Sequence, residues 1–352
     1  MKPPSRYRKK LKILAIYEVV KESFYRSEED RISEEDALDE IKIVINALKE
    51  NGHDVSEMEV YDNFAKEILK WKDSVDIVFN LAEGIDNDVT KVAYPSFILE
   101  SLGIPFTGCG WESFLLTTDK AKTKELLSIY NIPVTPHVVL NETPKTMPQN
   151  LTFPLFVKPV LSDASYGIDK NAVVHSFEQL AERVARVISI YKMPALVEPY
   201  VDGMDVHIGI MGNDYDNLDV MLPYGLMYKN LPDDEYPIRT FEEKFNPKSH
   251  VAKNSHIVHP APFDSYTIER IQDISAKIYQ ICKCSGYARL DFRVDKNMTP
   301  YFLEINVNPS LYPEDGFVVS TRDIGLNYNE FIERILSYGY ERSLTKSKIY
   351  KK

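Results

Sequence analysis

Glycine, cysteine and net positive charge are all scarce in this chain of 352 residues. Its 14 glycines amount to about 4%, against a usual ~7%, which disfavours a glycine-rich phosphate loop. The 42 basic residues are outnumbered by 53 acidic residues, and the net charge of −11 argues against a general nucleic-acid binder, because such proteins carry a basic surface excess. If the chain binds a phosphate compound, a few local side chains must do so against the overall charge.

The cysteines and the hydrophobic runs are also limited. Cys109, Cys282 and Cys284 are too few for a disulfide framework, and no second pair completes a four-ligand metal site with the last two, so we expect inert, buried thiols. The apolar run at residues 11–17 contains Lys12 and is too short for a signal peptide or a membrane span. We therefore expect a cytoplasmic protein with no membrane partner.

The first third of the chain alternates between the two periodicities of strands and helices. We expect strands at residues 11–17, 55–60 and 75–80 and helices at 37–48 and 92–102, with a charged loop at 18–36. Alternation of this kind predicts a parallel, doubly wound sheet. Such sheets bind ligands at the carboxyl ends of their strands.

The rest of the chain, whose length suggests one or two further domains, mixes strands with fewer helices. We expect helices at 119–130, 176–191 and 264–284, and strands at 153–159, 172–174, 195–200, 206–211, 218–222, 287–294 and 301–307. Ser176 and Gln179 have capping-box spacing. Loops are expected at 162–167 and 231–254, and a frayed, basic tail from residue 343.

The most informative segment is residues 287–311, YARLDFRVDKNMTPYFLEINVNPSL. Side chains two apart share one face of a strand, so both strands of this segment have one apolar and one polar face. If Asp291 lies opposite Glu304, the polar face presents two carboxylates together with the amide of Asn306 and the guanidinium of Arg289. Oxygen ligands of this kind suit Mg²⁺. The alternative is a solvent-facing hairpin with ordinary charge alternation.

This segment resembles the metal-binding motif of the ATP-grasp superfamily and, within it, of the D-alanine–D-alanine ligases. The resemblance implies an α/β protein, α+β in its ATP-grasp part, with a three-domain ATP-grasp fold and a doubly wound N-terminal domain. The domains implied are residues 1–118, 119–200 and 201–340, followed by a basic tail at 341–352. It also implies that Asp291, Glu304 and Asn306 hold two Mg²⁺ ions, which Mn²⁺ could replace.

Further motifs follow in the order of the family and imply an ATP site. The resemblance places Lys120, which opens a helix, and Lys158, in FPLFVKP, on phosphates. Ser165 lies in a short loop over the phosphates and is a candidate catalytic residue. In LVEPYVDGMD, Glu198 would read adenine and Asp205 would bind ribose, a position at which the family more often has glutamate.

Two further residues complete the implied catalytic set. Lys244, in TFEEKF, would neutralise phosphate charge from a mobile loop, in which Phe245 replaces the tyrosine usual in the family. Arg289 would steady the acyl-phosphate and the tetrahedral intermediate.

The substrate residues depart most from the family. Glu34 or Glu35 stands near the position of the glutamate that binds the first substrate's amine, with a solvated helix start as the alternative. Asn80-Leu81, followed by Glu83-Gly84, replaces the His-Gly of the family. After Asn308-Pro309, the family has Gly and then a serine-rich stretch that holds the carboxylate of the second alanine, whereas this chain continues from Ser310 as SLYPEDG. Acidic residues there would repel a carboxylate and favour an amine, so we expect a substrate pair other than D-alanine.

The sequence therefore predicts an ATP-dependent carboxylate–amine ligase that forms an amide or peptide bond through an acyl-phosphate. Its partners would be a small carboxylate and a small amine, and a homodimer is possible. The alternatives are a true D-alanine–D-alanine ligase of cell-wall synthesis, a non-catalytic ATP-binding protein of the same fold, and an ATP-grasp kinase that phosphorylates a hydroxyl.

Overall fold

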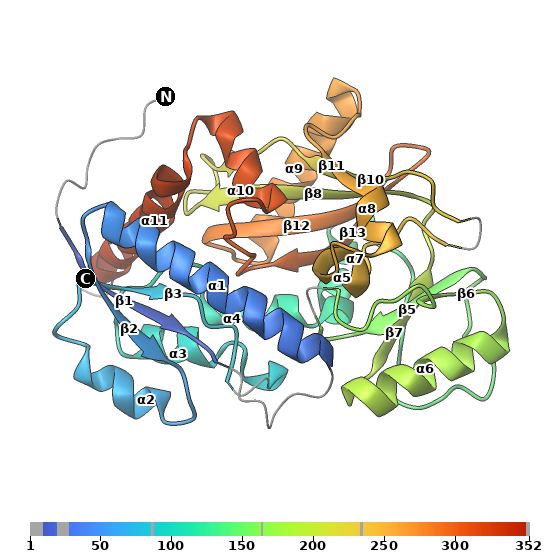
Figure 1. The fold of residues 1–352 in the computed structure, drawn as a ribbon, viewed down its shortest axis with the longest axis horizontal. Helices are drawn as coiled ribbons and strands as arrows, with labels where there is room; N and C mark the ends of the chain where they lie inside the picture. The colour runs from blue at the N-terminus through green and yellow to red at the C-terminus, as the bar shows by residue number, and fades with distance from the viewer. Residues whose placement is uncertain (1–9, 20–27, 86–87, 163–164, 233–234, 350–352) are drawn as a thin grey trace.

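The computed structural model describes residues 10–19, 28–85, 88–162, 165–232 and 235–349, and three sheets organise it (Figure 1). The first sheet has the order β2-β1-β3 and is parallel, as predicted. Its part of the chain contains β1 (Lys12–Tyr17), α1 (Glu28–Glu50), β2 (Asp54–Glu59), α2 (Phe64–Glu67), β3 (Ile77–Asn80), α3 (Tyr94–Ser101) and α4 (Trp111–Thr118).

Helix α1 begins earlier than the sequence indicated. The charged segment 18–36 was expected to be a loop, but residues 28–36 are helical, while residues 20–27 lie outside the described part of the chain. This first stretch is rich in acidic residues, which are favourable near the positive end of a helix and give no apolar periodicity to recognise. The helix ends at Glu50, where Asn51 and Gly52 follow, as predicted.

The second sheet has the order β4-β7-β5-β6, and all its pairs are antiparallel. It contains β4 (Val138–Leu140), β5 (Leu155–Pro159), β6 (Val173–Val174) and β7 (Ala195–Pro199), with α5 (Lys120–Ile129) before it and α6 (Phe177–Tyr191) between β6 and β7. Leu180, Val184 and Val187 of α6 pack with strand residues in one core. Ser176 caps α6 by accepting a hydrogen bond from the backbone N–H of Gln179.

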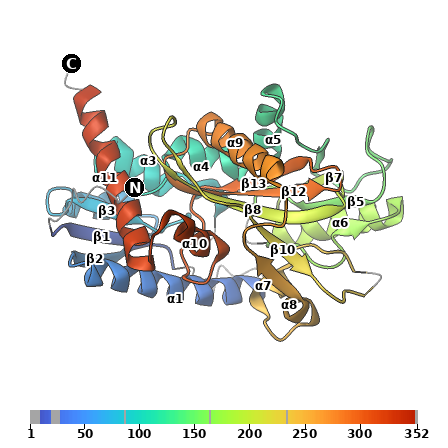
Figure 2. The ribbon, with the colours of Figure 1, turned by 90° about the horizontal axis from the view of Figure 1, so that it is seen from above.

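The third sheet has the order β11-β10-β8-β12-β13, with β9 paired to β8. Its strands are β8 (Gly203–Gly212), β9 (Asp219–Val220), β10 (Tyr224–Tyr228), β11 (Ser255–Val258), β12 (Gly286–Asp295) and β13 (Pro300–Asn306). The helices here are α7 (Phe241–Phe245), α8 (His250–Asn254), α9 (Ser265–Ile281), α10 (Gly316–Ser320) and α11 (Tyr328–Ile349). Figure 2 shows α9 on one side of this sheet and α10 on the other.

Three predictions in this part of the chain were wrong. Strand β10 was missed, because its pairing with β8 and β11, rather than an alternating pattern, determines it. The expected loop 231–254 contains α7 and α8. The expected frayed tail is helical as far as Ile349, and the Arg342 guanidinium anchors it by donating to the carbonyls of Phe106 and Gly108.

The structure also bears on the cysteines and on membrane-spanning helices. Cys109, Cys282 and Cys284 are buried free thiols, as expected. Across the described ranges, no helix combines the length and the apolar character needed to cross a bilayer.

Candidate active site

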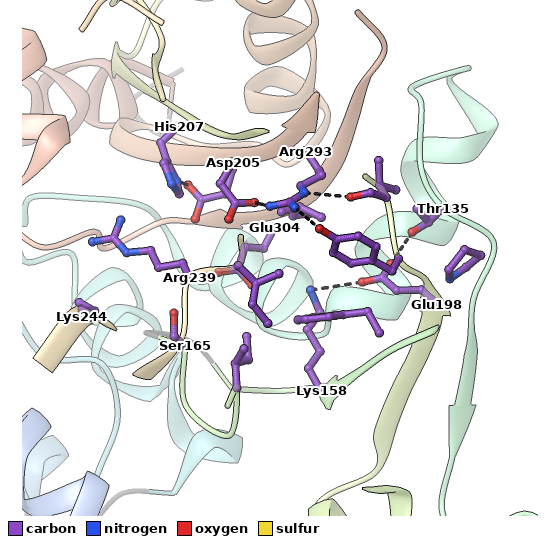
Figure 3. Close-up of a pocket in the computed structure, with 18 of the residues that line it drawn as sticks. Thr135, Lys158, Ser165, Glu198, Asp205, His207, Arg239, Lys244, Arg293 and Glu304 are labelled. Carbon is purple, nitrogen blue, oxygen red and sulfur yellow. Dashed lines mark hydrogen bonds and ion pairs between the residues drawn. The ribbon is translucent and has the colours of Figure 1, made fainter. Parts of the chain in front are cut away.

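A cavity of about 910 Å³, including its open mouth, lies between the second and third sheets (Figure 3). Strands β5 and β7 form one wall, β8, β12 and β13 form another, and α7 adds Lys244. The predicted site residues that line it are Lys158, Ser165, Glu198, Asp205, Lys244, Arg289, Asp291 and Glu304. Segments distant in the sequence thus converge on one space.

The two predicted metal-binding carboxylates face each other across adjacent strands. Asp291 of β12 pairs directly with Glu304 of β13, the register that the sequence suggested, and a bulge follows at once. Arg289 binds Asp291 through two hydrogen bonds, Nε to Oδ1 at 2.8 Å and Nη2 to Oδ2 at 3.0 Å. His207 Nδ1 also lies 2.8 Å from Asp291 Oδ1. The carboxylate of Glu304 lies 3.3 Å from the ammonium of Lys120.

Electrostatics keep Asp291 ionised. Burial raises the pKa of its carboxyl, but the charges of Arg289 and His207 outweigh burial and hold that pKa well below its usual range. The carboxylate of Asp291 is therefore a permanent anion at neutral pH, which is the form that binds a cation.

The donor set fits Mg²⁺ in its chemistry. Asp291, Glu304 and Asn306 supply two carboxylates and an amide from neighbouring positions, and Mg²⁺ prefers such oxygen ligands. All three already have protein partners, since Asn306 Oδ1 accepts from the N–H of Asn308 at 2.9 Å. Within the described ranges, no group of three or more His, Cys, Asp or Glu side chains is gathered as a preformed metal cage. A site of this kind takes its remaining ligands from phosphate oxygens and water.

At the other end of the cavity, Glu198 of β7 lies between two lysines. Lys124 and Thr135 both donate to its Oε2, and Lys158 Nζ lies 3.3 Å from its Oε1. Burial raises the pKa of Glu198, but the ammonium groups of Lys124 and Lys158 outweigh it and lower the pKa to about 2. The carboxylate thus fixes the position of Lys158, whose burial without a partner would be costly.

Asp205, the predicted ribose ligand, is held by a buried arginine. Arg293 Nη1 lies 2.8 Å from Asp205 Oδ1, and the same guanidinium donates to the Tyr200 hydroxyl at 2.7 Å and to the carbonyls of Val201 and Pro237. The Tyr200 ring also packs against this guanidinium, whose Cζ atom lies 5.2 Å from the centroid of the ring. The arginine therefore connects β8, the 200–201 turn and the 237 segment.

Lys244 enters the cavity from helix α7, and Ser165 enters it from a loop. Helix α7 begins at a cap in which Thr240 Oγ1 accepts from the N–H of Glu243 at 3.0 Å, and Lys244 Nζ lies 4.7 Å from the ring centroid of Phe245. Ser165 has a left-handed backbone, φ +62°, in the predicted loop 162–167. Residues 163 and 164 of that loop lie outside the described part of the chain.

The predicted substrate residues lie elsewhere. Among the described side chains, Glu35, Asn80, Glu83 and Ser310 do not line this cavity, and the side chain of Glu34 is not among those described. Glu35 is exposed and pairs with Arg31, while Asn80 is buried and accepts from the N–H of Ala82. Ser310 donates its hydroxyl to Glu40 at 2.6 Å.

Sequence reasoning missed several cavity residues. They are Thr135, His207, Arg239 and Arg293, together with Lys124, which lies behind Glu198. The sequence contained signals for two of these residues. Arg293 shares the polar face of β12 with Arg289 and Asp291. His207 shares a face of β8 with Asp205, because the two positions are two apart.

Comparison with protein families gives a match over most of the chain. The family described as D-ala D-ala ligase C-terminus matches residues 126–337. A protein from Sinorhizobium fredii, named y4sG and described as uncharacterized, is 32% identical over 266 residues, which cover 76% of this chain and 75% of that protein. A D-alanine–D-alanine ligase from Caldicellulosiruptor bescii is 26% identical over 307 residues, which cover 82% of this chain and 78% of the relative.

A solved structure shows the same fold. The structure of a D-alanine–D-alanine ligase from Bacillus anthracis, complexed with ATP, superposes with a TM-score of 0.72, covering 96% of this chain and 99% of that one at 19% identity. The predicted fold class is therefore confirmed.

Proposed function

Because the chain belongs to the D-alanine–D-alanine ligase family and is an ATP-dependent ligase, we propose that it activates a small carboxylate as an acyl-phosphate and joins it to a small amine. The observation that carries this proposal is the facing pair of Asp291 and Glu304 with Arg289 beside it. A cavity lined also by Lys158 and Lys244 surrounds the pair.

The parts of ATP would occupy different parts of the cavity. Glu198 would read adenine, and Asp205, which is paired with Arg293, would bind the ribose. Lys120, Lys158 and Lys244 would contact the phosphates, with Ser165 in the loop above them. Fixed cations that face a transferring phosphoryl group stabilise its developing charge, which is the main contribution of a protein to this chemistry.

Asp291, Glu304 and Asn306 would hold Mg²⁺, and we propose two ions, with Mn²⁺ as a substitute. When bound, the metal would neutralise charge on the phosphate oxygens. Arg289 would stabilise the oxygen that becomes negative when the amine attacks the acyl carbon. The buried guanidinium retains its charge throughout, because Asp291 raises the pKa of Arg289 against the effect of burial.

The substrate pair is proposed to differ from two molecules of D-alanine. The segment after Ser310 carries Glu314 and Asp315. Asp36 and Glu40 of α1 belong to the same region: burial raises the pKa of both carboxyls, and the charge of Asp315 adds to this effect. Negative charge at this end disfavours a substrate carboxylate. The relative from C. bescii is named as a D-alanine–D-alanine ligase. The joining of two D-alanine molecules is therefore the second candidate reaction.

The test is an ADP-release screen over pairs of small acids and amines with Mg²⁺ present, with mass spectrometry of the products. We expect ADP and phosphate release that depends on both substrates, with an amide product. A phosphorylated product formed without an amine would instead indicate a kinase. Rapid formation of D-alanyl-D-alanine at millimolar D-alanine would establish the second candidate.

A further inference from the structure

The carboxylate of Glu40, on α1, occupies a two-point clamp at the end of β13. Ser310 donates its hydroxyl to Glu40 Oε2 at 2.6 Å, and Leu311 donates its backbone N–H to Oε1 at 2.8 Å. A hydroxyl and a backbone N–H aimed at the two oxygens of one carboxylate form a general carboxylate-binding arrangement. Here a side chain of the protein itself fills it.

The clamp is rigid. Ser310 Oγ also accepts from the N–H of Tyr312 at 3.2 Å, and the carbonyl of Leu311 accepts from the Tyr328 hydroxyl at 3.0 Å. Both donors are therefore held in place by contacts that do not involve Glu40, and they would remain aimed at the same point if Glu40 were removed.

Helix α1, which carries Glu40, contacts α7, and α7 contributes Lys244 to the lining of the cavity. Figure 3 shows Lys244 and Glu198 at opposite ends of the cavity. Burial raises the pKa of Glu40, while the hydrogen bonds from Leu311 and Ser310 and the charge of Lys244 act in the opposite direction. Ser310 follows the proposed metal ligand Asn306 by four residues. If the acceptor, which is the amine substrate, binds at the Lys244 end of the cavity and carries a carboxylate, that carboxylate would lie close to the clamp.

We propose that Glu40 is a specificity residue: it fills the Ser310–Leu311 clamp, excludes acceptors with a carboxylate beside the amine, and so selects a primary amine that has no α-carboxylate. This inference rests on the proposed ligase function. Asp36 and Asp315 act in the same direction, because their negative charges would repel a second carboxylate.

The step itself is an ordinary acyl transfer. The free amine attacks the acyl carbon, a C–N bond forms, and the C–O bond to phosphate breaks with its electron pair leaving on the phosphate. The proton lost from nitrogen goes to the released phosphate. No oxidant or further co-reactant is needed.

The experiment compares matched acceptors that differ only by the carboxylate. Alanine, in both enantiomers, is compared with ethylamine, and glycine with methylamine, using each acid that supports hydroxamate formation when hydroxylamine is the acceptor. We expect the wild-type chain to prefer the plain amine of each pair by at least about tenfold in kcat/KM, because an acceptor carboxylate would have to displace Glu40 from its hydrogen bonds. Equal or better use of the amino acids would overturn the proposal.

Variants test the clamp directly. Glu40→Ala should raise kcat/KM for the amino-acid acceptors by about tenfold or more relative to the plain amines, because it frees both donors. Adding Ser310→Ala to Glu40→Ala should remove most of that gain. Asp39→Ala, an exposed neighbour on α1, is the matched control and should leave the preference unchanged. An unchanged preference in a folded Glu40→Ala protein contradicts the proposal, and if that variant does not fold, the wild-type comparison decides.

Failure of this inference can be separated from failure of the ligase proposal. Hydroxylamine is small and carries no carboxylate, so hydroxamate formation reports the activated acid whatever fills the clamp. No hydroxamate with any acid would count against the ligase proposal. Hydroxamate formation together with efficient use of amino acids would count against the role of Glu40 alone.

Discussion

The Oε1 atom of Glu198 lies 3.3 Å from the Nζ atom of Lys158, and both side chains are at most 5% exposed. The carboxylate predicted to read adenine thus also fixes a lysine predicted to contact phosphate. Lys124, with a fully buried side chain, completes the cluster from the opposite side of Glu198. One carboxylate thus neutralises the charges of two buried lysines.

Glu198→Gln is expected to destabilise the protein by about 3–5 kcal/mol, because removing one partner leaves buried charge uncompensated. Urea unfolding at pH 7 would measure the free energy of unfolding. Glu182→Gln, at an exposed position of α6, is the control and should change it by less than about 0.5 kcal/mol. A loss below 1 kcal/mol in Glu198→Gln would show that the cluster contributes little.

The same carboxylate gives a pH dependence. Its pKa is lowered from 4.5 to about 2 in the folded chain, so its contribution to stability is present above pH 4.5 and is lost as the pH falls toward 2. The contribution is about 3 kcal/mol at most. Urea unfolding from pH 6 to pH 2.5 should therefore show a shallower decline in Glu198→Gln than in the wild type. Parallel declines in the two proteins would contradict the assignment.

Glu304→Gln is expected to reduce acid-dependent ADP release by at least about a hundredfold, because the proposed Mg²⁺ would lose a charged oxygen ligand. Excess EDTA should abolish turnover in the wild type, and added Mg²⁺ should restore it. Circular dichroism would check that the fold is retained. Near-normal ADP release in the folded variant would contradict the metal assignment.

Asp205→Asn should weaken the recognition of ribose. We expect the wild type to prefer ATP over 2′-deoxy-ATP, and the ratio of their kcat/KM values should fall by about tenfold in the variant, since a charged hydrogen bond is worth roughly 1.5–3 kcal/mol. The variant also frees Arg293 from its ion pair, so the ratio, and not the absolute rate, is the useful measurement. An unchanged ratio would place the ribose elsewhere.

Asp119→Ala tests the helix that carries Lys120 and Lys124. Asp119 caps α5 by accepting from the N–H of Lys122 at 3.1 Å. Loss of this cap should cost about 1 kcal/mol of stability and, by loosening the start of α5, raise KM for ATP. Asp119→Ser keeps a capping side chain and should recover most of the loss in urea unfolding. Equal losses in the two variants would show that the cap is not the cause.

Much of the fold could be predicted from the sequence because local patterns specify it. Alternating residues in β12 and β13 predicted the polar face, and the observed register places Asp291 opposite Glu304, the pairing that was assumed from the sequence. Strand β10 and helices α7 and α8 could not be predicted, since strand pairing and caps such as that of Thr240 decide them.

The candidate site divides in the same way. Motifs that resemble those of the family were enough to identify Lys158, Glu198 and Asp291 as candidate site residues. They did not identify Arg293 or His207, because the importance of these two depends on the carboxylates that they meet across strands. The proposed specificity residue Glu40 was the least predictable, since it meets its partner Ser310 across about 270 residues of sequence.

The sequence by itself determined the family, the ATP-dependent chemistry and the small number of cations that must act against a net charge of −11. Only the tertiary structure showed how those charges are paired: Asp291 with Arg289, Glu304 with Lys120, and Glu198 between two lysines. The physical reason is that burial makes an unpaired charge costly. Each charge must find a partner in space, and the linear order of residues does not record which one.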